Sequence, residues 1–185
     1  MARMHRRSQR RRYERKIEHR QWFTNVGFHS SSITTSGTGS QIVKVFVDPL
    51  RGDDQTILRT RGIVAVNLSS LGQDAIGVMA ATVLPNKTAN NASFSELPNP
   101  FVDEDTTNWF VWHPFTIGRT LADSGSASSS EESFVPVNSM HIDSKAKRIM
   151  EASESVVWIL GVSPQAAVSN KGFTVGYTIR SLVGY

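Results

Sequence analysis

Short runs of β-branched and aromatic residues, separated by turn-forming residues, recur along most of the chain. Runs of this length and composition are typical of strands. In one run, Phe173, Val175, Tyr177 and Ile179 occupy alternate positions and therefore share one face of an extended backbone. The same argument predicts strands over residues 41–47, 57–68, 75–84, 108–115, 134–142, 155–162 and 173–182.

Helical patterns are rare in this part of the chain. Only the pattern of residues 144–152 is compatible with a helix, and it fits an extension of the preceding strand equally well. Within 57–68, Gly62 interrupts the run and predicts a bulge or a bend at a sheet corner. Seven or eight strands without alternating long helices predict an all-β fold, a single jelly roll or antiparallel β-sandwich.

Three segments lack a core pattern. Residues 25–39 are rich in Ser, Thr and Gly and predict a linker, whereas 86–107 and 122–133 predict loops. The loop 86–107 is longer than compact domains usually contain without a function, so we expect a surface or subunit-contact role for it. The predicted organisation is therefore an arm (1–24), a linker (25–39) and a β domain (40–185).

The charge of the chain is concentrated at its N-terminus. Residues 1–20 contain nine Arg or Lys and two Glu, a formal charge of +7, which leaves 11 basic and 14 acidic residues, or −3, for the rest. Arginine binds phosphate oxygens bidentately and stacks on bases, so its excess over lysine favours a nucleic-acid partner. The candidate nucleic-acid-binding residues of the arm are Arg3, Arg6, Arg7, Arg10, Arg11, Arg12, Arg15, Lys16 and Arg20.

An irregular arginine-rich segment acts mainly through phosphate contacts and does not read base sequence. The alternatives are a nuclear-localisation signal, a mitochondrial transit peptide and a solvated basic tail. Glu14 and Glu18 argue against the transit peptide because such peptides are poor in acids. The pattern of residues 10–22, with Arg10 and Glu14 as i,i+4 neighbours, predicts a helix that is only marginally stable alone. Binding to nucleic acid, or docking on the β domain, would supply the missing stability.

The β domain has one tight basic cluster, Lys145, Lys147 and Arg148. These residues are candidates for a further nucleic-acid contact. The alternative is an exposed charged edge that discourages strand pairing with other chains.

No catalytic or cofactor pattern occurs. Cysteine is absent, the five histidines are scattered, and the chain has neither a phosphate-binding glycine loop nor a nucleophile elbow. We therefore expect no enzyme, no resident metal or cofactor and no small-molecule substrate. The acids of 53–54 and 103–105 stay open as calcium ligands. No apolar stretch approaches the roughly 18 residues of a membrane span, so we expect neither a membrane anchor nor a secretory signal.

The Arg-rich arm opening Met1-Ala2-Arg3, the Ser/Thr/Gly linker and the strand-rich domain with long loops together resemble the coat proteins of small icosahedral viruses. The organisation is most similar to the single jelly-roll coats of circular single-stranded DNA viruses. The segment 143–148 is similar to an Asp-x-Lys-Ala-x-Arg stretch of small viral or phage-like coats.

This resemblance implies a capsid shell of many copies that packages viral DNA or RNA, with the arm on the inner surface against the genome. It also implies a location in the virion and passage through the host nucleus before assembly. The arm departs from the family because it is shorter and less purely basic than many coat-protein arms. It would neutralise little genome per subunit, and the cluster 145–148 is the natural addition.

Two other classes of protein compete with this interpretation. A monomeric nucleic-acid-binding β-barrel, of the ribosomal or single-strand-binding type, is expected to spread basic and aromatic residues over its folded surface. The negative charge of residues 21–185 favours a separate assembly role for the domain. A cell-surface β-sandwich adhesin is the third class, and it has no use for the arm.

The number of basic residues in the arm sets an upper limit on how steeply nucleic-acid affinity falls with salt concentration. Each phosphate neutralised on a single strand contributes about 0.7 to the log–log slope of affinity on salt, so the nine basic residues contribute at most about 6. Replacing all nine by Gln should reduce the slope by no more than this amount, measured by oligonucleotide anisotropy titrations at several salt concentrations. An unchanged slope would show that the arm does not contact phosphates.

Overall fold

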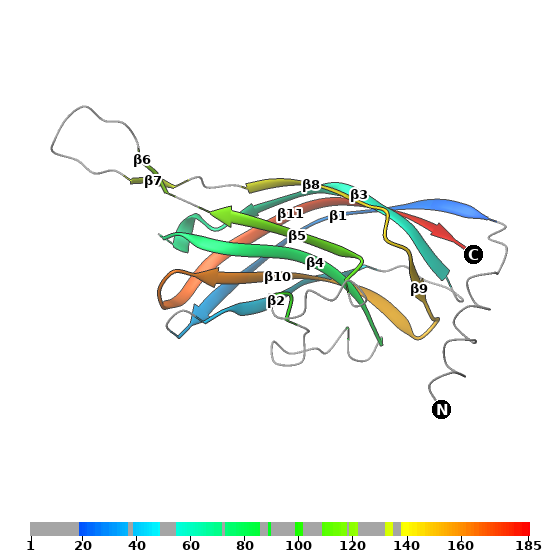
Figure 1. Ribbon diagram of the computed structural model, residues 1–185, viewed down its shortest axis with the longest axis horizontal. Coiled ribbons are helices and arrows are strands. Elements are labelled where there is room, and N and C mark those ends of the chain that lie inside the picture. Colours follow the sequence, from blue (N-terminus) through cyan, green and yellow to red (C-terminus); the bar gives the residue numbers. More distant parts are fainter. Residues whose placement is uncertain are drawn as a thin grey trace.

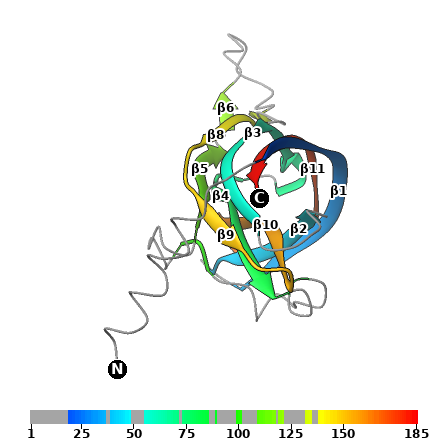
Figure 2. The same ribbon diagram turned by 90° about the vertical axis from the view of Figure 1, so that its right-hand side faces the viewer.

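The computed structural model describes residues 19–36, 39–48, 55–71, 73–85, 89, 99–101, 109–117, 119–121, 132–134 and 138–185. Two antiparallel sheets pack face to face, and Figure 2 shows their strands curving around a common interior. The five-stranded sheet contains β1 (Arg20–Thr35), β11 (Val168–Gly184), β3 (Gln55–Asn67), β8 (Asn138–Ser144) and β9 (Arg148–Met150). The four-stranded sheet contains β2 (Gln41–Asp48), β10 (Glu154–Pro164), β4 (Ala75–Pro85) and β5 (Val111–Ile117).

A short ribbon of β6 (Arg119–Leu121) and β7 (Glu132–Phe134) and a 3₁₀ turn, η1 (Ser69–Leu71), complete the described elements. The all-β class predicted from the strand runs is confirmed. All seven predicted strands overlap observed ones, and the region 144–152 holds the end of β8 and the short strand β9, as the strand alternative required.

The strands pair in a nested order. β4 pairs with β5, β3 with β8, β2 with β10 and β1 with β11, so the chain behaves as one long antiparallel hairpin whose two arms return along each other. Rolling this hairpin adds the pairings of β11 with β3 and of β10 with β4. The resulting sheet orders, β1-β11-β3-β8 and β2-β10-β4-β5, define a jelly roll.

The predicted linker is wrong for the residues that the structure describes. Residues 20–35 form β1, which pairs with β11 in continuous register from Arg20 opposite Gly184 to Ile33 opposite Lys171. The β domain therefore includes Arg20 and does not begin at residue 40. The inward positions of β1 include Asn25, Gly27 and His29, which are not apolar, so no hydrophobic alternation marks the strand.

Two further local predictions are corrected. The helix predicted for 10–22 is wrong at residues 20–22, which belong to β1, and residues 10–18 lie outside the described part. The bulge expected at Gly62 lies instead at Leu58, because the register with β11 shifts between Leu182 and Val183. Gly62 itself stays in register opposite Ile179, where its missing side chain makes room for that residue.

The inner faces of both sheets form one apolar core, and an aromatic stack crosses it. Phe46 of β2 stacks on Trp158 of β10 at 5.5 Å between ring centroids, and on Tyr177 of β11 at 3.8 Å. Because Phe46 and Trp158 belong to one sheet and Tyr177 to the other, the stack joins the two layers. Such pairs contribute about 0.5–1.5 kcal/mol beyond their burial.

Two glycines lie opposite large aromatic residues across the strands. Gly27 of β1 faces Tyr177, and Gly77 of β4 faces Phe115 of β5. In both pairs the aromatic ring lies over the glycine, so a methyl group at the glycine would overlap the ring. A glycine covered by a cross-strand ring weakens the strand less than an exposed one.

The outer side of the four-stranded sheet is also covered, by described parts of the long segment after β4. Trp109, Ala89 and the partly buried Phe101 pack there against Val157 and Ile159 of β10. This second layer explains why β10 is buried on both faces and reads as a continuous apolar run.

The glycine–aromatic pairs predict a sharp packing effect. Gly77→Ala should lower the free energy of unfolding by about 1–3 kcal/mol because Phe115 must move within a packed core. Gly172→Ala is the matched control, since no atom lies within 4 Å of a methyl group there, and its effect should stay within about 0.5 kcal/mol. Urea titrations of both variants measure the difference, and equal losses would contradict the role assigned to Phe115.

Candidate nucleic-acid interface

Four of the predicted nucleic-acid-binding residues lie in the described part of the chain. Arg20 begins β1, Lys145 and Lys147 lie on the connection between β8 and β9, and Arg148 begins β9. The other eight, Arg3, Arg6, Arg7, Arg10, Arg11, Arg12, Arg15 and Lys16, lie outside the described residues.

The register brings the end of the arm and the basic cluster to the same end of one sheet. Arg20 lies opposite Gly184, Gly184 opposite Thr56, and Thr56 opposite Ile149, the residue after Arg148. Three strand spacings, about 14 Å, separate Arg20 from β9 along this row. In Figure 1 the start of β1 and the end of β11 lie side by side at this end of the sandwich.

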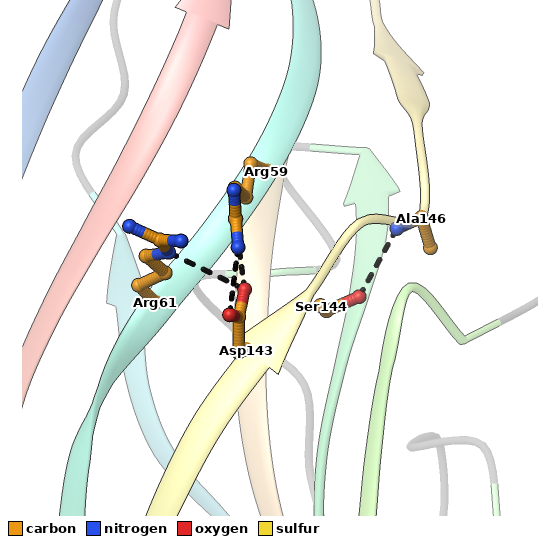
Figure 3. Close-up of polar contacts among 5 residues, drawn as sticks. All are labelled: Arg59, Arg61, Asp143, Ser144 and Ala146. Atoms are coloured by element: carbon orange, nitrogen blue, oxygen red, sulfur yellow. Dashed lines mark hydrogen bonds and ion pairs between the residues drawn. The ribbon is translucent and has the colours of Figure 1, made fainter.

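The connection that carries the cluster is held in place by Ser144. Its hydroxyl donates a hydrogen bond to the carbonyl of Phe110, next to β5, and accepts one from the amide of Ala146 at 3.3 Å (Figure 3). Lys145 and Lys147 are exposed, whereas Arg148 is half-buried opposite Ile57. The cluster lies at the edge formed by β8 and β9, so its position fits the charged-edge alternative as well as a nucleic-acid contact.

Three further arginines, which the sequence analysis did not single out, lie on the outer side of this sheet. Arg61 of β3 is directly opposite Arg180 of β11, and Arg59 lies two residues away on the same side of β3. Directly opposite residues share a face of the sheet, and all three face away from the core. The Arg-x-Arg spacing at 59–61 is a sequence signal for two arginines on one strand face, but the addition of Arg180 requires the strand register.

Asp143 of β8 holds two of these arginines. Arg59 donates to its two carboxylate oxygens, from Nε to Oδ1 at 2.8 Å and from Nη2 to Oδ2 at 2.7 Å, and Arg61 Nε reaches Oδ1 at 3.4 Å. Figure 3 shows both guanidinium groups converging on the carboxylate from β3. The hydrogen bonds from Arg59 lower the pKa of Asp143 from its ordinary value to about 2.

Arg180 is arranged differently. Its guanidinium carbon lies 5.3 Å from the ring centroid of Trp22 on β1, within the range of a cation–π contact. Trp22 points outward and is 37% exposed. The strand pairing thus places an aromatic ring and three guanidinium groups on one open face, with one carboxylate among them.

The charge is divided between the two sheets. The strands of the five-stranded sheet contain six Arg or Lys and a single acid, Asp143, whereas those of the four-stranded sheet contain Lys44, Asp48 and Glu154. The net charge of −3 for residues 21–185 therefore conceals a basic sheet, because most acids lie in the connections.

The described residues contain no group of three His, Asp or Glu placed to hold a metal ion. The acids of 53–54 and 103–105, left open as calcium ligands, lie outside the described part. None of the described segments is a helix long and apolar enough to cross a membrane.

No protein-family model matches the sequence, and no curated protein is significantly similar to it. Among solved structures, a chain of the infectious bursal disease virus Gx strain is similar at 9% identity and a TM-score of 0.42, over 91% of this chain and 32% of that one. A CocE/NonD family hydrolase from Staphylococcus aureus matches at 9% identity and a TM-score of 0.39, over 87% and 37%. The chain thus spans about a third of the length of these proteins, and similarities this weak do not decide function.

The ion pair predicts the titration of Asp143. Because its folded-state pKa lies below the ordinary 3.8, the pair stabilises the fold above about pH 4, and this contribution is lost as the pH falls towards 2. Arg59→Gln should return the pKa of Asp143 towards 3.8, measured by NMR titration of its carboxyl carbon. Arg61→Gln, which removes the longer contact, should have the smaller effect, and the reverse order would contradict the assigned geometry.

Proposed function

We propose that this chain is a viral coat protein that assembles with its own copies into a capsid and packages the genome through its basic N-terminal arm. The observation that carries the proposal is the attachment of residues 1–19, with a formal charge of +6, to the first strand of a jelly roll. A jelly roll alone serves viral coats, lectins and cupins, so the fold does not choose among them. The arm favours the coat because a polyanion partner explains its charge.

The described surface offers apolar groups suited to contacts between copies. Val26 and Phe28 of β1 are 67% and 70% exposed, and Ile63 of β3, in the same row as Val26, is 48% exposed. On the four-stranded sheet, Ile76 and Trp112 are 55% and 43% exposed. Two different apolar surfaces on one chain suit the heterologous contacts from which closed shells are built.

Strand β1 adds a second feature favourable to assembly. It is a 16-residue strand at the edge of the five-stranded sheet, so one side of its backbone has no neighbouring strand in this sheet. Monomeric proteins usually shorten or block such edges. We infer that contacts between subunits cover this edge in the capsid.

The proposed location of the protein follows from the coat function. We infer that the assembled particle is the virion, and that the arm permits entry into the host nucleus before assembly. The packaged polymer is DNA or RNA, and the resemblance to coats of circular single-stranded DNA viruses favours DNA.

One observation favours the alternative of a monomeric nucleic-acid-binding module. The five-stranded sheet carries six basic residues and one acid, as expected of a protein that binds nucleic acid on its folded surface. The two functions differ in assembly: the module stays a monomer of 20.4 kDa when it binds an oligonucleotide, and the coat does not.

Light scattering coupled to size-exclusion chromatography, with absorbance at 260 and 280 nm, tests the coat function. The full chain should elute as a particle of about a megadalton or more that contains nucleic acid. Replacing by Gln the eight basic residues before Arg20, which leaves β1 intact, should remove most of the nucleic acid. As a control, Lys87→Gln removes one charge outside the arm and should retain it. A stable nucleic-acid-free monomer for the full chain at low salt would contradict the coat function.

A further inference from the structure

The outer side of the five-stranded sheet carries a group of residues that we name the arginine face: Trp22, Arg59, Arg61, Asp143 and Arg180. We propose that the arginine face binds single-stranded nucleic acid as a second contact, continuous with the arm. The proposal deepens the packaging function and rests on it, because both assign nucleic acid as the partner. It adds Trp22, Arg59, Arg61 and Arg180, which lie on strands of the folded sheet and are not among the nucleic-acid-binding residues predicted from the sequence.

Electrostatics gives the first argument. Arg61 and Arg180 are directly opposite on neighbouring strands, so their Cα atoms lie only about 4.5–5.5 Å apart, and like charges in such pairs destabilise a sheet. Asp143 accepts hydrogen bonds from Arg59 and Arg61, and within the described strands of this sheet it is the one acid. The face keeps a net positive charge that phosphate groups would neutralise.

The chemistry of the groups gives the second argument. Guanidinium groups bind phosphate oxygens through paired hydrogen bonds, and the side chain of Arg61 stays 49% exposed beside its contact with Asp143. Trp22 is 37% exposed and has the guanidinium of Arg180 over its ring at 5.3 Å, and an aromatic ring on the outer side of a sheet is a group on which unpaired bases stack. Three guanidinium groups beside one aromatic ring therefore fit a single strand, whose bases are free to stack, better than a duplex, whose bases are stacked internally.

Position gives the third argument. Arg20 precedes Trp22 on the same side of β1, and the row Arg20, Gly184, Thr56 adjoins the row Trp22, Leu182, Arg59. The arm thus joins the sheet about 7 Å from the arginine face, a distance set by two residues along a strand. A nucleic-acid strand bound by the arm therefore reaches the arginine face without passing around the β-sandwich. Lys145 follows Asp143 by two residues, so the cluster predicted from sequence borders the same face.

The test compares two substitutions on the same strand. Arg180→Gln and Lys171→Gln each remove one exposed positive charge from β11, but Lys171 lies at the opposite end of the sheet, paired with Ile33. Binding of a fluorescent 20-nucleotide oligo(dT) to the dissociated full chain is followed by anisotropy at several salt concentrations. Arg180→Gln should weaken binding about 5-fold or more at low salt and lower the log–log salt slope by about 0.7. Lys171→Gln should leave both nearly unchanged.

Trp22→Ala supplies a readout that a general loss of charge does not reproduce. It should weaken binding by at least about 5-fold while the salt slope stays constant, because stacking releases no counterions. Thermal melting of each variant confirms that the fold is retained. Trp22→Phe, which keeps a ring, should restore most of the affinity if Trp22→Ala proves unstable.

The outcomes separate this proposal from the packaging function. Equal effects of Arg180→Gln and Lys171→Gln, or no effect of either, overturn the arginine face, while the arm variant decides packaging independently. If Arg180→Gln changes the size of the assembled particle and leaves oligonucleotide affinity unchanged, the face contacts a second copy of the chain and the proposal is wrong. Loss of affinity for Arg180→Gln alone, with residual binding in the arm variant, supports it.

Discussion

The requirement that two sheets bury their apolar faces against each other governs this molecule. The chain meets it by folding as one long antiparallel hairpin, so each sheet receives strands from both halves of the sequence. The stack of Trp158, Phe46 and Tyr177 joins the layers where β2, β10 and β11 meet. The first and last strands pair along nearly their whole length, so hydrogen bonds between them hold the two ends of the domain together.

The same pairing determines what the outer surface presents. β11 lies between β1 and β3, so Arg180 from the end of the chain is placed beside Trp22 from its beginning and opposite Arg61 from its first third. The four-stranded sheet has instead an outer side partly covered by Trp109, Ala89 and Phe101. One sheet thus has an open outer side that carries the arginines and, further along the same strands, the exposed Val26, Phe28 and Ile63, and the other sheet carries part of a long connection.

The difference between the outer sides of the two sheets bears on the choice between a coat protein and a monomeric nucleic-acid-binding module. A coat protein needs one surface directed to nucleic acid and others that contact its neighbours, whereas a monomeric binding module needs only the first. The exposed Val26 and Phe28 on a long edge strand are a liability for a monomer and a resource for an assembly. The arm and the basic sheet suit both functions, so self-association is the property that separates them.

The amino-acid pattern alone predicted the all-β class, most strand positions and the concentration of positive charge in the first twenty residues, because side-chain periodicity and net charge are local properties. It did not identify β1, whose inward Asn25, Gly27 and His29 carry no apolar pattern and whose extended backbone depends on hydrogen bonds to β11. The net charge of residues 21–185 likewise did not reveal that basic residues lie on the five-stranded sheet while most acids lie in the connections. These features depend on the folded arrangement of the strands, since strand register brings together residues that are far apart in the chain and no local pattern encodes that register.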